Sequence, residues 1–201
     1  EGLRIPPIRI VQEDKILQDV FDLVLLNVRV PSERRGDYMA QIAANRLGNR
    51  RLKELFKKWS KEQIELGCSA IIDAVTRRMR SSIAELPDGE YAFEDVLDDD
   101  GMGTENIPVV VKIEKQGEEI WLDFQGSGPQ VKGNMNNSFA GLQASVLFAL
   151  KVLVDPDGPT NHGMLEPVHI KAPEGSVVNA SFPAATAARA QTCQRIIDFF
   201  L

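Results

Sequence analysis

Residues 60–89 read SKEQIELGCSAIIDAVTRRMRSSIAELPDG, and this stretch decides the fold class. Ser60 and Gln63 have the form of a capping box, in which each side chain bonds the backbone N–H of the other residue. Apolar side chains then recur at helical spacing, at Ile64, Cys68, Ile71, Ile72, Val75, Met79 and Ile83. The stripe predicts a long amphipathic helix with Ile71 and Ile72 in its buried face. The turn residues at 86–89 end this helix.

Two more helices are predicted upstream of this stretch. Apolar residues at helical spacing between 16 and 24 indicate a short helix. Residues 29–36 should interrupt it, because Pro31 disfavours helix in the residue before it and Gly36 frees the turn. Asp37 is then the expected N-cap of a second helix that runs to about residue 58. Together with the following helix it predicts a helical hairpin.

The apolar period changes from helical spacing to simple alternation after residue 89, which indicates strands. Alternating segments lie at 91–93, 109–113 and 120–124. Gln116 and Gly117 lie between the last two and supply a hairpin turn, so we expect an antiparallel sheet with one buried face.

The rest of the chain adds helices and a strand to this sheet. A nearly all-apolar helix is expected from Ala140 to Val154, a further strand over 168–170 and 177–178, and a final helix from about Ala185 to Leu201. The fold class is therefore α+β, a helical hairpin packed with an antiparallel-rich sheet and further helices. We expect two segments that fold together as one unit truncated at both ends, a mainly helical one at 1–89 and a sheet one at 90–201.

The composition and charge of the chain restrict the kinds of partner that we expect it to bind. Lys and Arg number 23 against 29 Asp and Glu, which gives a formal charge of −6 and a pI near 5.1. An acidic protein repels phosphate backbones, so no nucleic acid is expected, and the basic cluster at 46–58 most simply forms a solvated helix face. No stretch approaches the ~18 apolar residues of a membrane span, and the first residues lack the apolar core of a signal peptide. Cys68 and Cys193 make no disulfide framework, so a cytoplasmic protein is expected.

None of the short motifs is sufficient for catalysis. Residues 126–128 lack the lysine-bearing glycine loop of a phosphate site and predict a turn at the end of a strand. Residues 98–101 lack the ligand pattern of a calcium loop and predict a solvated turn. His162 and His169 do not make a metal site without further ligands, so no metal is expected on this chain. Cys193 is more consistent with a buried thiol than with a nucleophile.

Polar side chains also lie in segments that should be packed. Asn136 precedes the buried helix, Asn161 lies in a Gly/Pro turn, and Gln191 and Arg195 lie on the final helix. Buried amides need partners, so such residues either pin loops or line a polar pocket. Arg195 has a forked donor that suits phosphate or carboxylate, although it could instead pair with Asp198 on the same helix. We expect the four residues to converge on an anion-tolerant site wall, with loop-pinning as the alternative.

A collinear series of short motifs covers essentially all 201 residues. It comprises 1–7 (EGLRIPP), 27–29 (NVR) with Pro31, 36–37 (GD), Gln41 with 43–45 (AAN), 86–89 (LPDG), 123–124 (DF), 126–127 (GS), 129–130 (PQ), 153–156 (LVDP), 172–176 (APEGS) and 194–195 (QR). In this series the chain resembles the hydantoinase B/oxoprolinase family, seen as the B subunit of N-methylhydantoinase or as the C-terminal half of 5-oxoprolinase. Each of the four expected wall residues falls in a segment that matches this family, so the resemblance implies a substrate-binding role for them.

The resemblance implies an ATP-dependent hydrolysis of cyclic amides such as hydantoin or 5-oxoproline. A separate A-type subunit with an actin-like fold would use ATP to phosphorylate the amide, and the B component would complete the hydrolysis. The expected assembly is a hetero-oligomer in which this chain binds no ATP. The family's His- and Asp-bearing segment, which binds a divalent metal in the carboxylase branch, would lie upstream of Glu1.

Two other functions stay open beside this one. Acetone and acetophenone carboxylases use related subunits, and a scaffold or interface module would have no chemistry of its own. Two positions also depart from the family pattern. His162 stands where the turn usually has Ala, and Arg189 and Gln191 stand where the last helix commonly has Asn and Glu. These exchanges alter the charge near the expected wall and therefore bear on the choice of substrate.

Overall fold

The computed structural model describes residues 5–200 and divides the chain into two compact units after Leu66. The N-terminal unit contains a short antiparallel hairpin of β1 (Val11–Gln12) and β2 (Lys15–Ile16), followed by α1 (Gln18–Leu26) and α2 (Pro31–Phe56). The division falls in the first turns of the next helix.

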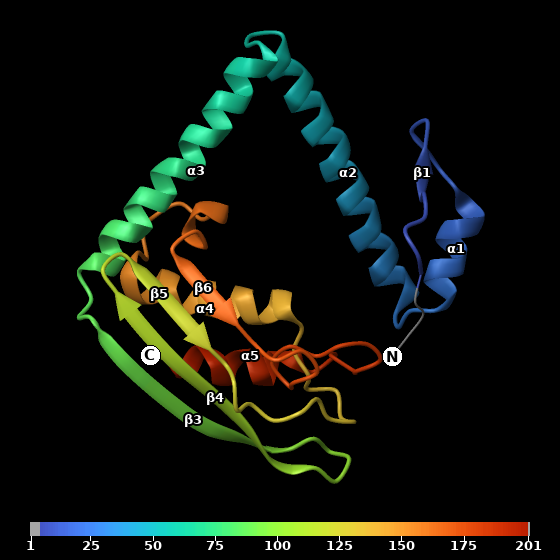
Figure 1. Cartoon of the computed structure of the whole chain (residues 1–201). Helices are drawn as coiled ribbons and strands as arrows, with labels where there is room; N and C mark the ends of the chain where they lie inside the picture. The colour runs from blue at the N-terminus through green and yellow to red at the C-terminus, as the bar shows by residue number, and fades with distance from the viewer. Residues whose placement is uncertain (1–4, 201) are drawn as a thin grey trace. The chain divides into compact units, whose positions relative to one another are not determined.

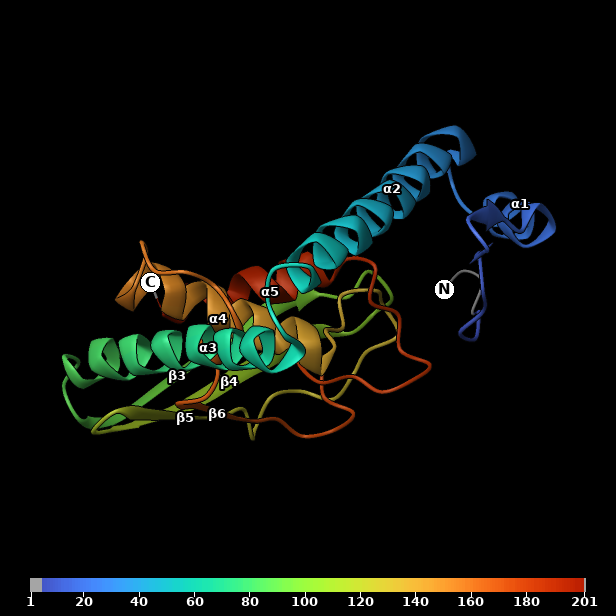
Figure 2. The same ribbon diagram turned by 90° about the horizontal axis from the view of Figure 1, so that it is seen from above.

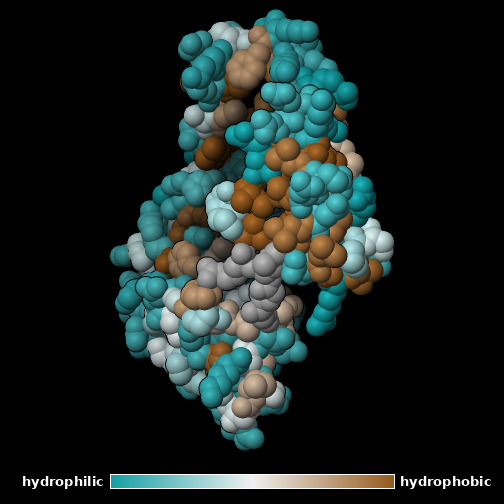
Figure 3. All heavy atoms as spheres, turned by 90° about the vertical axis from the view of Figure 1, so that its right-hand side faces the viewer, coloured by the Kyte–Doolittle hydropathy of each residue, from teal (hydrophilic) through white to brown (hydrophobic). Residues whose placement is uncertain are grey.

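The core of the N-terminal unit is small. It consists of Phe21, Val24 and Leu25 on α1, and Tyr38 of α2 meets the Phe21 ring edge-on with 5.9 Å between ring centroids. No residue of α2 is buried, although the helix is 26 residues long. Figure 3 faces this unit and shows apolar side chains, in brown, gathered in a patch on its surface.

The start of α2 corrects the prediction. The chain leaves the helix between α1 and α2 as predicted, but the break covers 27–30 rather than 29–36. The helix α2 already begins at Pro31, so the predicted N-cap at Asp37 is wrong. Proline at the first helical position loses no hydrogen bond, and its fixed φ suits the helix. The unfavourable backbone conformation occurs at Val30 instead, which has a left-handed φ of 51°. Gly36 lies within the helix on an open side, where an added Cβ would meet nothing within 4 Å.

Helix α3 (Lys61–Ala84) begins with the predicted capping box. The Ser60 N–H donates to Gln63 Oε1 at 2.9 Å, and the Gln63 N–H donates to Ser60 Oγ at 3.3 Å. The apolar stripe is buried only in its second half, at Val75, Met79 and Ile83. Ile71 is 62% exposed, so its predicted place in the core is wrong. The stripe is longer than the surface on which the helix packs.

A four-stranded sheet forms the base of the C-terminal unit. Its strands are β3 (Gly89–Asp99), β4 (Glu105–Gln116), β5 (Glu119–Asp123) and β6 (Val168–Lys171), in that order. β3, β4 and β5 are antiparallel neighbours, and β6 runs parallel to β5. Gly117 has φ of +59° at the tight β4–β5 turn, as the pair Gln116–Gly117 predicted.

Helices cover one face of this sheet. α4 (Phe139–Val154) and α5 (Arg189–Asp198) lie on the same side as α3, whereas no helix within residues 67–200 covers the other face (Figures 1 and 2). The core between the layers includes Ile83, Val109, Val111, Leu122, Phe124, Leu142, Val146 and Ile196. The α+β class, with its antiparallel-rich sheet and long α2 and α3 helices, is confirmed.

Two element boundaries differ from the prediction near the C-terminus. Val177 and Val178 are fully buried but belong to no strand, and Ser176 beside them forms only isolated bridges. The last helix starts at Arg189 rather than near Ala185. The preceding segment bonds elsewhere, because the Ala185 carbonyl accepts from the Asn136 side chain and the Ala188 N–H donates to the Asn134 carbonyl. Leu201 lies outside the described residues.

Candidate functional site

A groove of about 770 Å³ runs along the exposed side of α5. It is lined by α5, by the end of β3 with the turn after it, and by the segment that leads to α4, through Leu97, Asp98, Asp99, Asp100, Gly101, Asn134, Met135, Ala188, Ala190, Gln191, Gln194, Arg195 and Asp198. α5 is amphipathic: Thr192 and Ile196 are buried beneath it, so its polar residues face the groove. The structure therefore brings Gln191 and Arg195 together on one wall.

The Arg195 guanidinium is held by a carboxylate from the sheet. Its Nη1 donates to Asp95 Oδ2 at 2.7 Å, and its side chain is 36% exposed. The alternative partner considered from the sequence, Asp198, instead accepts from Gln194 at 3.0 Å. The Arg195 Nε is buried and has no hydrogen-bond partner among the described residues. The pairing with Asp95 leaves Arg195 anchored but still able to donate towards the groove.

Asp100 fixes the floor of the groove and was expected to be solvated. It is buried instead, and its two oxygens accept from the backbone N–H groups of Met102, Thr104 and Gly133. These bonds, that from Thr104 first, lower the pKa of Asp100 from 3.8 to about 2 despite its burial. The solvated turn predicted at 98–101 is therefore wrong at this residue. The carboxylate ties the β3–β4 turn to the segment at 133, so it serves as structure rather than as an acid.

Asn136 and Asn161 do not line the groove. Asn136 is fully buried: its Nδ2 donates to the carbonyls of Val131, Gly133 and Ala185, and its Oδ1 accepts from the Val131 N–H. These bonds hold the segment that carries the lining residues Asn134 and Met135. Asn136 thus holds a lining segment of the groove in place without lining the groove itself.

Asn161 caps a short 3₁₀ helix, His162–Met164, by accepting from the Gly163 N–H at 2.8 Å. Its Nδ2 contacts the Ile71 carbonyl of α3 at 3.5 Å. Both contacts are with backbone, which favours the loop-pinning alternative for this residue.

Two residues outside the four expected wall residues organise the groove, Asp95, which sequence reasoning missed, and Thr192, which it noted only as a polar residue of the last helix. Asp95 anchors Arg195, and Thr192 Oγ1 donates to the Met135 carbonyl at 2.5 Å, which joins α5 to the loop before α4. Both partners are distant in sequence, so no local spacing could have revealed them. Thr192 stands four residues before Ile196 and so shares its face of the helix, and this spacing was the available signal for Thr192.

Metal and membrane features are absent from residues 5–200. No three His, Cys, Asp or Glu side chains in that range come close enough to hold a metal ion. No helix there combines the length and the apolar character needed to cross a membrane. His162 and His169 lie on different elements, and His169 instead bonds Glu119 at 2.7 Å and stacks on Trp121.

The charge of the groove limits what it can bind. Asp98, Asp99 and Asp198 line it together with buried Asp100, and Arg195 is the one cation among its lining residues. Uncharged hydrogen-bonding groups suit such a lining, and an anion would be tolerated only beside Arg195. The amides of Gln191 and Gln194 add both donors and acceptors.

The sequence profile described as Hydantoinase B/oxoprolinase matches residues 1–201. The chain belongs to the hydantoinase B/oxoprolinase family. Within the family it is 30% identical over 209 residues to the B subunit of a putative D-/L-hydantoinase of Pseudomonas sp. (strain NS671), covering 98% of this chain and 35% of that protein. It is 32% identical over 186 residues to the beta subunit of the caprolactamase of Pseudomonas jessenii, covering 92% and 32%.

One solved structure agrees with this membership, and a second shares the fold. The ATP-dependent caprolactamase of Pseudomonas jessenii superposes with a TM-score of 0.87 at 29% identity, over 98% of this chain and 34% of that one. A nucleotide-free acetone carboxylase superposes with a TM-score of 0.78 at 12% identity, over 91% and 26%, which shows a shared fold alone. The chain spans about a third of the length of the hydantoinase and caprolactamase subunits that it matches.

Proposed function

We propose that this family member is part of the B component of an ATP-dependent cyclic-amide hydrolase that acts with a separate, ATP-using A-type subunit. The observation that carries the proposal is the 30–32% identity to the B subunit of a hydantoinase and to the beta subunit of a caprolactamase, over more than nine-tenths of the chain. The substrate class is a ring amide such as hydantoin, 5-oxoproline or a lactam. A cytoplasmic hetero-oligomer is part of the proposal.

The groove along α5 supports this substrate class. The amide group of such a ring presents one N–H donor and one carbonyl acceptor and is itself uncharged, and of the three rings only 5-oxoproline carries a charge, on its carboxylate. The Gln191 amide and the neighbouring carboxylates can accept the N–H of the ring, and Arg195 can donate to the amide oxygen, which carries the activating phosphate and on which negative charge develops during hydrolysis. In this proposal Gln191 and Arg195 contact the substrate, whereas Asn136 and Asn161 position the loops.

The same lining favours a division of labour between subunits. Four aspartates and one arginine make a poor site for the phosphates of ATP. Nucleotide chemistry therefore fits the partner subunit, and any divalent metal would be held by residues outside this chain. A calorimetric titration of the chain with ATP should give no micromolar binding, and tight binding would overturn this assignment.

The decisive experiment uses the complete B-type protein together with its A-type partner. Ring opening of hydantoin, 5-oxoproline and caprolactam is measured with and without ATP, alongside phosphate release. We expect one of these rings to open only with ATP, with phosphate released in proportion. Labelled bicarbonate in the same assay tests the carboxylase alternative, since incorporation of label without ring opening would replace the proposal. Absence of both activities would favour the scaffold role.

A further inference from the structure

The uncovered face of the sheet carries three exposed acids, Glu90, Glu94 and Glu114, and one exposed cation, Lys112, and none of the four forms an ion pair among the described residues. Glu90 on β3 and Glu114 on β4 are directly opposite in the strand register and lie on the same face. Both are exposed, and neither side chain has an ion pair or hydrogen bond among the described residues. Like charges in such a pair destabilise a sheet. By contrast, Glu119 on this face is already paired with Arg80 at 2.7 Å and with His169.

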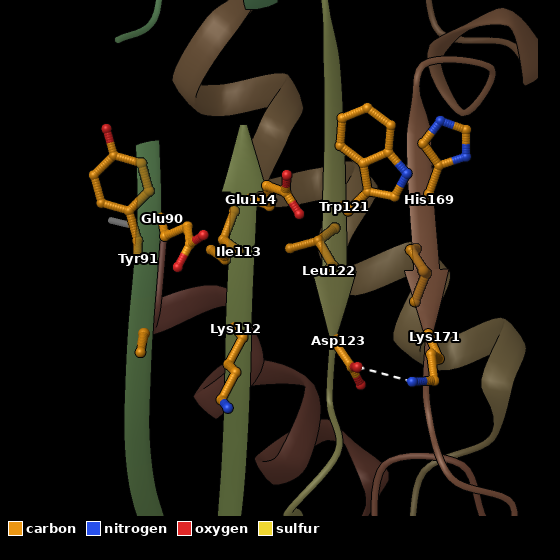
Figure 4. A pocket seen from close by; sticks show the side chains of 12 residues that line it. Glu90, Tyr91, Lys112, Ile113, Glu114, Trp121, Leu122, Asp123, His169 and Lys171 are labelled. Carbon is orange, nitrogen blue, oxygen red and sulfur yellow. Dashed lines mark hydrogen bonds and ion pairs between the residues drawn. The ribbon is translucent and has the colours of Figure 1, made fainter. Parts of the chain in front are cut away.

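An aromatic centre lies beside these acids. Trp121 is directly opposite Glu114, and His169, on its other side, stacks on it with 5.0 Å between ring centroids. The hollow over this face measures about 660 Å³, and the side chains of Glu90, Glu114, Trp121 and His169 stand along its upper row in Figure 4. Lys171 in the lower row is neutralised by Asp123 at 2.9 Å, the dashed line in the figure. Along β3 and β4 the three unpaired acids outnumber Lys112, so this part of the face keeps a net negative charge beside its aromatic centre.

Helix α2 has the opposite character. Leu52, Leu55 and Phe56 form an apolar stripe that continues to Trp59, and these side chains are 43–53% exposed. Six basic residues and one acid lie between 46 and 58, in a chain whose formal charge is −6. Arg50, Lys53, Lys57 and Lys58 form no ion pair among the described residues, and three of them line a groove of about 520 Å³.

The two surfaces match in size as well as in charge. Arg50 and Lys57 are separated by ~10 Å along the helix axis, at about 1.5 Å per residue. Glu90 and Glu94, both exposed on the open face, are separated by ~13 Å along β3, at about 3.3 Å per residue. A helix that lies on this face would bury Leu52, Phe56 and Trp59 against the Trp121 region and bring its basic flank to the acid pair.

We propose that the chain self-associates, with α2 of each copy packed on the open sheet face of a second copy. The occupant is another copy because this chain itself supplies both complementary surfaces. In a dimer in which each copy both gives and receives α2, the contact forms twice. Self-association is independent of the enzymatic proposal.

Sedimentation equilibrium of the 201-residue chain tests the proposal. We expect a concentration-dependent dimer whose dissociation constant rises at least about tenfold between about 0.1 M and about 1 M salt, because the screening length falls from about 10 Å to about 3 Å. The variant R50E/K53E/K57E and the variant E90K/E94K/E114K should each be monomeric. Mixed together they should form a heterodimer, since the reversed charges are again complementary.

A matched control reverses two exposed cations outside both surfaces, Arg77→Glu and Lys132→Glu, and should leave the dimer intact. Circular dichroism melts verify that all variants fold. Wild-type chain that stays monomeric at every concentration overturns the proposal. So does a dimer that survives both triple reversals, because the contact would then lie elsewhere.

Discussion

The Nη1 atom of Arg195 on α5 lies 2.7 Å from the Oδ2 atom of Asp95 on β3, across 100 residues of sequence. The pair joins the last helix to the edge of the sheet beside the acidic groove. Its side chains are 36% and 44% exposed, and pairs this open contribute little to folding. Orientation of the guanidinium is therefore the larger effect of Asp95.

This relationship gives the first prediction, which rests on the proposed activity. In the complete complex, Arg195→Ala should lower kcat roughly a hundredfold, as loss of a donor to a developing oxyanion does. Its free energy of unfolding should change by less than about 1 kcal/mol. Turnover assays and urea melts measure the two quantities. Arg189→Ala on the same helix is the control and should alter neither; a large loss of stability in Arg195→Ala would instead indicate a structural role.

The second prediction concerns the buried amide behind the groove. Asn136→Ala removes the partners of three carbonyls and one N–H and should destabilise the protein by at least about 3 kcal/mol. Gln191→Ala, on the exposed side of α5, should stay within about 0.5 kcal/mol of wild type. Denaturant melts compare the two. Equal stability of both variants would mean that Asn136 does not hold the loop.

The third prediction separates the two halves of the α3 stripe. Ile83 is fully buried, so Ile83→Ala should cost about 2–5 kcal/mol. Ile71 is 62% exposed, so Ile71→Ala should cost less than about 0.5 kcal/mol. Both variants shorten the same residue type on the same helix, so Ile71→Ala is the control for Ile83→Ala in urea melts. A similar cost at both sites would show that Ile71 is covered in solution.

The fourth prediction is a pH dependence. In the folded state the pKa of Asp100 is lowered from 3.8 to about 2. As the pH falls, the unfolded chain therefore takes up a proton at this carboxylate before the folded chain does. Its contribution to stability is complete above about pH 5 and is lost as the pH falls through about 4 towards 2. Asp100→Asn cannot accept all three N–H bonds and should be less stable at neutral pH. The stability difference from wild type should shrink steadily below pH 4; a difference that stays constant with pH would rule out this titration.

Local sequence was sufficient for features that depend on neighbouring residues. The Ser60–Gln63 capping box, the turn at Gly117 and the apolar segment of α4 were all predicted, because each rests on contacts or backbone angles within a few residues. Family membership was also accessible, since it depends on the order of many short motifs along the chain. The α+β class followed from the change of apolar period near residue 89.

Tertiary structure decided which polar residues share a surface. Of the four expected wall residues, it brings Gln191 and Arg195 to the groove, gives Asn136 backbone partners behind it, and leaves Asn161 with backbone partners elsewhere. It also buries Asp100, exposes Ile71 and pairs Arg195 with Asp95. Helical spacing defines which side chains share a face, but whether that face is covered depends on elements tens of residues away. Burial and long-range charge pairing are therefore properties of the packed layers, and the linear pattern does not contain them.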